Sequence, residues 1–308
     1  MKAGILLPHV GENATRDNVL YVAKEIERQG LDSVWALDRL LWPLKPQTPY
    51  VASPDGSLPS EYQNVLDPLE TLTYLAANTE RISLGTSIID MLFDNPVILA
   101  KRLATLDELS GGRVIVGFGL GWSKDEYDAS GIPFKDRGAR ADEFLQVVKR
   151  IWTDEVVEFK GRFYNIPASK IGPKPIQRPH PPIVLGGFTP NTFPRIAKFA
   201  DGWMPIAGFG PLEQIEQAVT GLKEAARKQD RDPSKIKVFV LTYPFVLESA
   251  GDHRSPMAGD IDQIGSDIEK IKSIDGVEHI IFGYAFSPVG RDVKKMVELT
   301  AQLARFAR

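Results

Sequence analysis

Short apolar runs alternate along this chain with longer stretches in which apolar residues recur every three or four positions. The first pattern is typical of buried strands and the second of amphipathic helices. Strands are predicted at residues 2–8, 32–38, 81–88, 113–119, 182–187, 202–206, 236–248 and 278–284. Helices are predicted at residues 17–29, 68–78, 96–109, 137–152, 191–200, 211–228, 261–273 and 289–306.

This order of elements predicts the fold class. Near-continuous apolar strands indicate parallel pairing with both faces buried, and strand–helix units repeated along 308 residues fit the usual size of a closed barrel. The turn after the first strand lacks a pyrophosphate-binding signature, which disfavours a doubly wound sheet. We therefore expect an α/β protein, a single (β/α)8 TIM barrel spanning residues 1–308, with insertion loops at its C-terminal face.

Three segments are longer than the usual connections of such barrels. Residues 39–67 hold Trp42, Tyr50 and Tyr62 among prolines and glycines, and follow a strand's carboxyl end, so they form either a surface insertion or a lid over the mouth. Residues 155–181 are proline-rich and aromatic, which predicts an excursion or short hairpin. Residues 249–260 are small and polar, and are a second candidate lid.

Composition excludes several classes of function. The net charge is −3 with Lys and Arg spread throughout, so no nucleic-acid surface is expected. The chain has no cysteine, which removes disulfides, thiol nucleophiles and cysteine metal sites. The first apolar run is too short for a signal peptide, and no run approaches the length of a membrane span. We expect a cytoplasmic protein with a small-molecule substrate and no nucleic-acid or membrane partner.

Reactive groups are few. His9, His180, His253 and His279 show no metal-ligand spacing, so no metal site is predicted and each is interpreted as structural or solvated. No serine-nucleophile elbow, zinc-protease or P-loop motif occurs. Asp38 and Asp90 are the clearest carboxylates at strand ends; Asp38 either lines the site or serves as a turn or cap residue. A large pocket with so few reactive groups indicates borrowed cofactor chemistry.

The stretch "RVIVGFGLGW" at residues 113–122 partly matches a dinucleotide fingerprint. Gly117 and Gly119 supply the first two glycines of G-x-G-x-x-G, but Trp122 stands at the third position. No helix pattern begins at once in the residues that follow. A plain glycine turn after a strand is therefore favoured; in a barrel this loop would line the mouth, where glycines allow close approach to a flat ligand.

Four stretches together resemble a known family. They are "GLDSVWALD", "RISLGTSIIDMLFDNPVILAKRLATLDELSGGRVIVGFGLGW", "RGARADEFLQVVKRIW" and "PPIVLGGFTPNTFPRIAKFADGW", which span most of residues 30–203. In order and spacing the chain is similar to the luciferase-like flavin and deazaflavin superfamily of barrel oxidoreductases. More narrowly, it resembles the branch that depends on coenzyme F420.

The resemblance implies a cofactor ring lying across the barrel mouth, with homodimers common. Ser87 and Ile88, joined by a non-prolyl cis peptide, would support one ring face. The phosphate would lie on a turn at a helix N-terminus, where free backbone N–H groups suit an anion. The residues implied to bind cofactor are Ser87, Ile88, Gly119, Leu120, Gly121 and Trp122 beside the ring and sugar-alcohol chain, and Gly186, Gly187, Phe188 and Thr189 at the phosphate.

The chain also departs from the family pattern. Asp38-Arg39 stands where members often carry Asp-His, and Trp122 where some carry a glutamate, so those acid–base roles do not transfer. Asp38 and Arg39 are the candidate catalytic residues. Arg39 could orient a substrate, polarise an oxyanion, bind cofactor, or be a solvated lid residue.

The function expected from the resemblance is that of an F420-dependent oxidoreductase. Such an enzyme transfers a hydride between the deazaflavin ring and a small organic substrate. One alternative is a two-component monooxygenase that uses FMN and O2. The two candidates differ chemically, since a reduced flavin reacts with oxygen far better than a reduced deazaflavin. The other is a flavin-binding barrel without catalysis.

Overall fold

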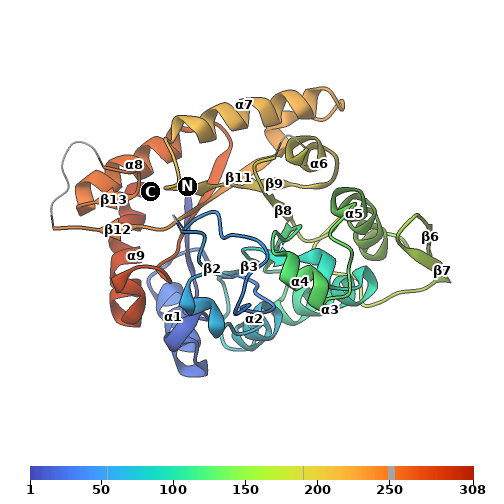
Figure 1. Cartoon of the computed structure of the whole chain (residues 1–308), viewed down its shortest axis with the longest axis horizontal. Helices are drawn as coiled ribbons and strands as arrows, with labels where there is room; N and C mark the ends of the chain where they lie inside the picture. The colour runs from blue at the N-terminus through green and yellow to red at the C-terminus, as the bar shows by residue number, and fades with distance from the viewer. Residues whose placement is uncertain (54, 190, 249–253) are drawn as a thin grey trace.

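Parallel strands close into a barrel in this computed structural model, which describes residues 1–53, 55–189, 191–248 and 254–308 (Figure 1). Each strand pairs in parallel with the next, and the last pairs with the first, so the eight-stranded TIM barrel predicted from the sequence is confirmed. In ring order the strands are β1 (Lys2–Leu6), β2 (Ser33–Ala36), β3 (Ser83–Thr86), β5 (Val114–Gly119), β8 (Ile183–Gly186), β9 (Gly202–Met204), β11 (Lys237–Thr242) and β14 (Val277–Phe282). Two short strands, β4 (Ile89–Asp90) and β10 (Ile206–Ala207), follow β3 and β9 in the chain and pair with β5 and β11.

Helices surround the barrel and follow their strands in chain order. They are α1 (Arg16–Arg28), α2 (Pro68–Ala76), α3 (Pro96–Ser110), α5 (Arg137–Thr153), α6 (Thr192–Phe199), α7 (Glu213–Arg227), α8 (Ile261–Ser273) and α9 (Val293–Ala307). Side-chain caps fix several starts: Asp67 accepts the backbone N–H of Leu69, with Pro68 in the first turn, and Asp260 forms a capping box with Gln263. Within the described residues, the structure contains no helix of the length and apolarity that a membrane span needs.

Three elements differ from the sequence prediction. A short helix, α4 (Lys124–Ala129), follows the glycine loop, where no helix was predicted. The sequence lacks an amphipathic pattern there, and the helix instead makes contacts with residues 39–67. The seventh strand ends at Thr242, since Pro244 cannot donate to a ladder; a separate pair, β12 (Phe245–Val246) with β13 (Ala258–Gly259), follows. The final helix begins later than predicted, after a 3₁₀ turn, η5 (Pro288–Arg291).

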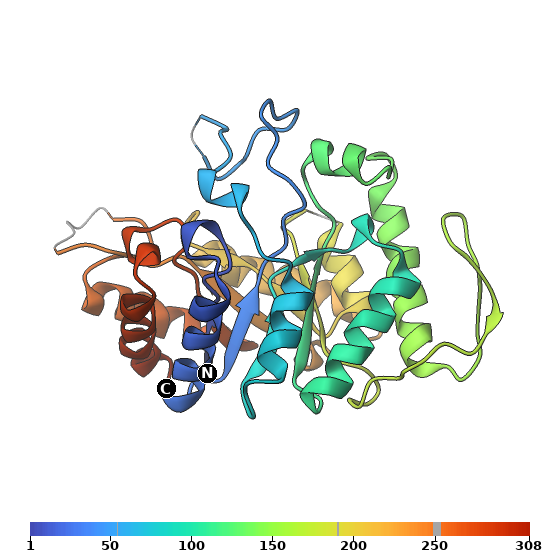
Figure 2. The same ribbon diagram turned by 90° about the horizontal axis from the view of Figure 1, so that it is seen from below.

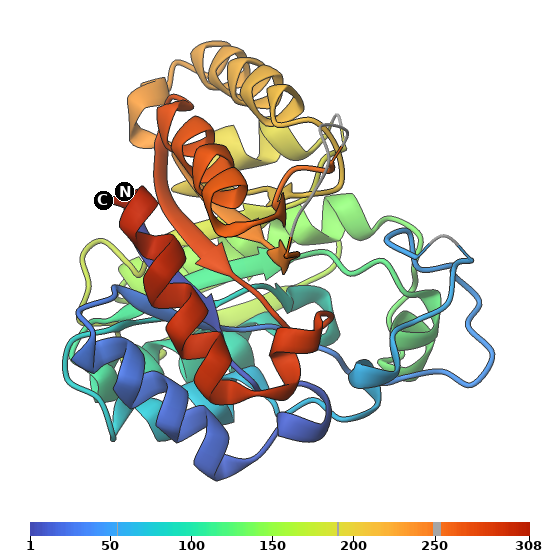
Figure 3. The same cartoon turned by 90° about the vertical axis from the view of Figure 1, so that its left-hand side faces the viewer.

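The long segments have distinct structures. Residues 155–181 contain the predicted hairpin, formed by β6 (Val157–Lys160) and β7 (Asn165–Ser169). Residues 39–67, called the mouth insertion below, include η2 (Ser60–Gln63) and rise beside α4 at the carboxyl ends of the strands (Figures 2 and 3). Of the other candidate lid, residues 249–253 lie outside the described residues, and β13 occupies part of the remainder.

The core has two layers, which explains the continuous apolar strands. One cluster fills the space between strands and helices; the other fills the barrel interior around Trp35, Phe239 and Ile281. A β-carbon on Gly85 would lie 2.1 Å from the Trp35 ring, so the indole occupies the space that a side chain on β3 would need. The indole N–H donates to Ser33 Oγ at 2.7 Å, which satisfies its polar edge.

This packing predicts the effect of adding one methyl group. We expect Gly85→Ala to destabilise the protein by about 1–3 kcal/mol, because it overpacks the indole inside a rigid ring of strands. The measurement is urea unfolding followed by tryptophan fluorescence. Gly221→Ala is the matched control: its β-carbon would meet Phe193 at an ordinary 3.6 Å on α7, so it should leave stability unchanged or raise it. Equal stability of Gly85→Ala and the parent protein would contradict this account.

Candidate active site at the barrel mouth

The carboxyl ends of three neighbouring strands bring together the residues predicted on their loops. Asp38 follows β2, Asp90 follows β3, and both lie beside the loop that ends β5. The Asp90 backbone N–H donates to Asp38 Oδ2 at 3.3 Å, and the Arg39 guanidinium lies 3.9 Å from Asp90 Oδ2. Asp38 therefore lines the mouth beside a second, almost completely buried carboxyl group.

Arg39 is not the solvated lid residue that the sequence left open, because its side chain is only 5% exposed. Its Nε donates to Glu126 Oε1 at 2.8 Å, and its Nη2 forms a second short contact with the other carboxylate oxygen. Glu126 is fully buried on α4 and also accepts the backbone N–H of Leu40 at 2.8 Å. This paired geometry joins the mouth insertion to α4.

Glu126 is the main residue of the candidate site that the sequence did not predict. It lies four residues beyond Trp122, inside "SKDEYDAS", on the helix that was not predicted. An acidic pair directly after a strand-end loop is the signal that could have identified it. Its contact with Arg39 is made across 87 positions of sequence, which only the folded barrel brings together.

Burial and mutual repulsion perturb the acids around this guanidinium. Burial, with the charges of Glu126 and Asp94, raises the pKa of Asp38 to about 6. Burial and the Asp38 charge raise the pKa of Asp90 to about 8, against the opposing influence of Arg39. Asp90 therefore holds a proton at neutral pH, and perturbed carboxyl groups of this kind are typical of catalytic sites.

Aromatic rings cross the mouth in an unbroken series, which we call the aromatic belt. It runs through Trp122, Tyr50, Tyr62, Phe286 and Tyr243, with successive ring centroids 5.4, 6.1, 5.2 and 5.5 Å apart. The belt thus joins the loop after β5, the mouth insertion, and the loops after β14 and β11. Tyr243 and Phe286 were not singled out in the sequence, because single aromatics after strands carry no motif.

Arg39 contacts the belt through its flat face. Its guanidinium carbon lies 5.1 Å from the Trp122 ring centroid and 5.5 Å from that of Tyr62, both within cation–π range. Below the belt, Ile88 and Ile206 pack against the interior cluster of the barrel. The mouth therefore combines an apolar floor with one guanidinium that already has a partner.

The mouth insertion is fastened to α4 by further contacts. The Gln47 backbone N–H donates to Asp125 Oδ2 at 2.9 Å, and its side-chain amide donates to Asp128 Oδ2 at 2.9 Å. The Lys124 backbone N–H donates to Thr48 Oγ1 at 3.1 Å. These bonds and the Arg39–Glu126 pair hold the insertion over the side of the mouth nearest β5.

Two glycines near the end of β5 lie against protein atoms of the neighbouring strand end. A β-carbon on Gly119 would lie 1.8 Å from Ile88 Cδ1, and one on Gly117 would lie 1.9 Å from the Thr86 carbonyl oxygen. The glycines let β3 and its extension approach β5 closely. The Ser87–Ile88 peptide bond is cis, at the position where the family resemblance places one, and Ser87 Oγ lies 3.3 Å from the Met204 sulfur. Leu120 is half-buried against the helix–strand core.

The turn after β8 exposes polar backbone at the start of α6. Gly187 has φ of +118°, and a β-carbon there would lie 3.1 Å from Thr192 Oγ1. Trp203 Nε1 donates to the Gly187 carbonyl at 2.9 Å and positions the turn against the barrel. Gly186 ends the strand, and Phe188 and Thr189 are exposed beyond it. These features leave the turn exposed at the start of a helix; position 190 lies outside the described residues.

The histidines have structural environments where they are described. His9 is buried and contacts the carbonyl oxygens of Leu7 and Leu37, while His279 Nε2 lies 2.8 Å from Ser33 Oγ in the barrel interior. His180 is buried beside Trp152, and His253 lies outside the described residues. Over the described part of the chain, no cluster of three His, Cys, Asp or Glu side chains is arranged to hold a metal ion.

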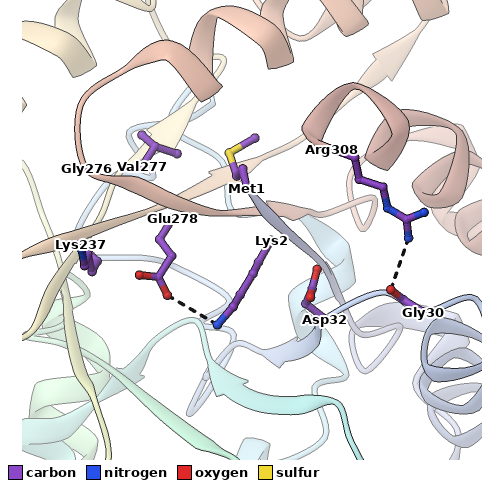
Figure 4. A pocket seen from close by; sticks show the side chains of 9 residues that line it. All are labelled: Met1, Lys2, Gly30, Asp32, Lys237, Gly276, Val277, Glu278 and Arg308. Atoms are coloured by element: carbon purple, nitrogen blue, oxygen red, sulfur yellow. Dashed lines mark hydrogen bonds and ion pairs between the residues drawn. The ribbon is translucent and has the colours of Figure 1, made fainter.

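A depression at the opposite end of the barrel is a weaker candidate (Figure 4). Charged groups surround it, including the Lys2–Glu278 ion pair at 3.6 Å and Arg308, which donates to the Gly30 carbonyl at 3.3 Å. It lies at the amino ends of the strands, beside both chain termini. Catalytic groups of this fold gather at the carboxyl ends, so the mouth is the candidate active site.

The sequence of this chain is similar to those of known proteins. The sequence profile described as luciferase-like monooxygenase matches residues 1–269. An uncharacterised protein of Mycobacterium tuberculosis is 37% identical over 184 residues, which cover 59% of this chain and 65% of that protein. An F420-dependent glucose-6-phosphate dehydrogenase of Amycolatopsis mediterranei is 31% identical over 226 residues, covering 70% and 61% of the two chains. The chain thus spans slightly less than two thirds of the length of each.

Two solved structures share the fold. An F420-dependent secondary alcohol dehydrogenase, in complex with an F420–acetone adduct, superposes with a TM-score of 0.80 at 20% identity, covering 100% of this chain and 99% of its own. A monooxygenase of Streptomyces bottropensis gives a TM-score of 0.76 at 23% identity, with 98% of both chains covered. At this identity the likeness concerns the fold alone.

The raised pKa of Asp90 predicts a pH-dependent stability. The folded state favours the protonated carboxyl, so its stabilising effect is complete below the ordinary pKa near 4 and is lost as pH rises through about 8. Between pH 5.5 and 8.5, the free energy of unfolding of the parent protein should therefore fall by at least about 1 kcal/mol more than that of Asp90→Asn, whose side chain cannot ionise. Urea unfolding at both pH values tests this. The exposed-site control Asp17→Asn should behave like the parent; an Asp90→Asn variant that also does so would refute the prediction.

Proposed function

The chain belongs to the luciferase-like monooxygenase family, and on that premise we propose that it is an F420-dependent oxidoreductase. In this proposal it transfers a hydride between the deazaflavin ring and a small organic substrate at the barrel mouth. The Amycolatopsis relative named for F420 dependence supports this choice of cofactor. The observation that carries the proposal is the mouth itself, where carboxyl groups with raised pKa values lie at the same rim as an apolar floor.

The residues present fit such a cofactor. Ser87 and Ile88 would support one face of the ring, and the loop Gly119–Trp122 would lie beside the sugar-alcohol chain of the cofactor. The turn Gly186–Thr189 would hold the phosphate, because its exposed backbone at a helix start suits an anion. When bound, the deazaflavin supplies a hydride donor or acceptor, which the side chains of this protein cannot provide.

Proton movement is the part that this chain's own residues would perform. Reduction of a carbonyl adds a proton to the substrate oxygen, and oxidation of an alcohol removes one. Asp38, half-buried at the mouth with its pKa raised to about 6, is the residue we propose to exchange that proton. Asp90 is protonated at neutral pH and donates its backbone N–H to Asp38, so it orients the reacting carboxyl group. Arg39 holds the loop after β2 in place through Glu126.

An FMN-dependent monooxygenase is the second candidate. The structural neighbour from Streptomyces bottropensis, named as a monooxygenase, is the observation that favours it. A flavin-binding barrel without catalysis is the third reading, which the departure Asp38-Arg39 from the common Asp-His pair leaves open. Cofactor preference separates the first two candidates, and turnover separates both from the third.

Titrating the purified chain with F420 and FMN separately is the decisive measurement. We expect micromolar or tighter affinity for F420 and weaker affinity for FMN, followed through the fluorescence of each ring. FMN affinity equal to or tighter than that for F420 would overturn the proposal. If the protein with F420 bound turns over no alcohol, aldehyde or ketone in a panel, the non-catalytic reading is favoured.

The proposed phosphate turn gives a separate prediction. Gly187→Val should weaken F420 binding by about tenfold or more, because a branched side chain fills the turn against Thr192. The fold should survive, since the turn is exposed. Gly30→Val, at a positive-φ glycine near the opposite end of the barrel, is the control for backbone strain and should keep the parent affinity. A folded Gly187→Val variant with unchanged affinity would show that the turn is purely structural.

A further inference from the structure

The aromatic belt and the charges behind it indicate the class of substrate. We propose that the mouth selects an uncharged molecule with an apolar or aromatic body, and that Glu126 determines this preference by neutralising Arg39. The inference rests on the proposed function in placing the substrate at the mouth, and it narrows that substrate to neutral alcohols, aldehydes or ketones. Glu126 acts here as a specificity-determining residue and not as a reacting group.

The first argument is the balance of charge. Asp38 and Arg39 follow β2, Asp90 follows β3, and Glu126 lies on α4, so three carboxyl groups surround one guanidinium. The charge of the Arg39 guanidinium is compensated, because its Nε and Nη2 groups both donate hydrogen bonds to the Glu126 carboxylate. The two side chains are 5% and 0% exposed, so the pair is shielded from solvent. An anionic group entering here would lose its hydration and meet carboxylates in place of a free cation.

Cations from the neighbouring elements do not correct this balance. Lys124, at the start of α4, pairs with Asp128 at 2.6 Å. Arg254, after β11, pairs with Asp267 at 2.6 Å. Tyr127 on α4 remains neutral because burial raises its pKa. Arg137 and Arg140 on α5 act on the Tyr127 hydroxyl, whereas Arg39 is the cation that acts on the Asp90 carboxyl group.

The second argument is the chemistry of the surface. Ile88, Ile206, Tyr62 and Tyr243 are partly buried and pack on the interior cluster of the barrel, so they form its upper apolar layer. Burial raises the pKa values of Tyr62 and Tyr243, so both rings stay uncharged phenols. Rings at this spacing offer stacking and edge contacts to an aromatic or aliphatic body, and their hydroxyl groups can bond a neutral oxygen.

Glu126 is the residue that keeps Arg39 from acting as an anion receptor. An arginine fork binds a substrate carboxylate or phosphate as readily as a protein carboxylate. The present fork already has its carboxylate, supplied by α4, and its flat face lies against Trp122 and Tyr62. Removing the Glu126 charge would leave a buried cation that an anionic ligand could neutralise.

Calorimetric titration with matched probes tests this directly. Benzyl alcohol, benzaldehyde and benzoate share one ring and differ in charge. At pH 8 we expect benzyl alcohol and benzaldehyde to bind the parent protein at least about tenfold more tightly than benzoate, because benzoate brings an unpaired charge. Glu126→Gln should reduce that ratio by about tenfold or reverse it, through tighter benzoate binding.

The controls keep the outcome interpretable. Glu143→Gln removes a carboxylate that accepts the backbone N–H groups of Arg162 and Phe163 on the far side of α5, and should leave the ratio unchanged. If Glu126→Gln does not fold, Arg39→Met combined with Glu126→Leu removes both charges and should retain the preference for the alcohol. Tyr243→Ala should weaken binding of the two neutral probes.

Three outcomes would overturn the proposal: benzoate binding as tightly as benzyl alcohol to the parent protein, no binding of any probe, or an unchanged ratio in a folded Glu126→Gln variant. Each titration is run on the chain alone and on the chain with F420 added. Probe selectivity is thus measured apart from cofactor affinity. Loss of F420 binding with the selectivity intact would contradict the proposed function alone.

Discussion

The parallel pairing of β14 with β1 is the constraint on which the structure depends. It closes the sheet, so every strand loses both edges and buries both faces, one against the barrel interior and one against the helices. Closure also directs all carboxyl ends of the strands to one rim. Residues from distant parts of the chain, such as Asp38, Asp90 and Tyr243, become neighbours there without any local sequence motif that joins them.

At that rim, the cost of burying charge organises the mouth. Asp38 and Asp90 face each other across adjacent strand ends, and their pKa values rise because burial and repulsion both favour the protonated forms. Arg39 moderates this repulsion while Glu126 takes its hydrogen bonds. The family membership of the chain is compatible with several substrates and cofactors. This local balance of charge, more than the fold, is what would distinguish one family member from another.

The glycines at the end of β5 illustrate how a ligand-like pattern can have a packing origin. In the sequence, Gly117 and Gly119 partly match a dinucleotide fingerprint, and the loop from Gly119 to Trp122 is expected to approach a flat ligand. In the structure the atoms nearest to their missing side chains belong to Thr86 and Ile88. A close approach of two strand ends and a close approach to a ligand both require glycine, so the pattern identifies crowding without identifying the neighbour.

Much of the architecture is encoded locally. Apolar runs bounded by glycine and proline, and caps such as Asp67 with Pro68, determine where elements start and end, since these signals act over a few residues. The order and spacing of the motif stretches are sufficient to indicate the family. The strand of residues 236–248 was predicted too long because Tyr243-Pro244 breaks a pattern that remains apolar beyond it.

The sequence by itself determined the barrel, the long insertion after β2 and the strand-end positions of Asp38, Ser87 and Gly187. Tertiary structure alone decided that α4 forms, that Glu126 captures Arg39 and that five aromatic residues meet across the mouth. The physical reason is range. Periodicity and capping reflect interactions within one element. The charge and shape of the mouth arise from side chains far apart in the sequence, such as Tyr62 and Phe286, whose contacts become definite only when the ring of strands closes.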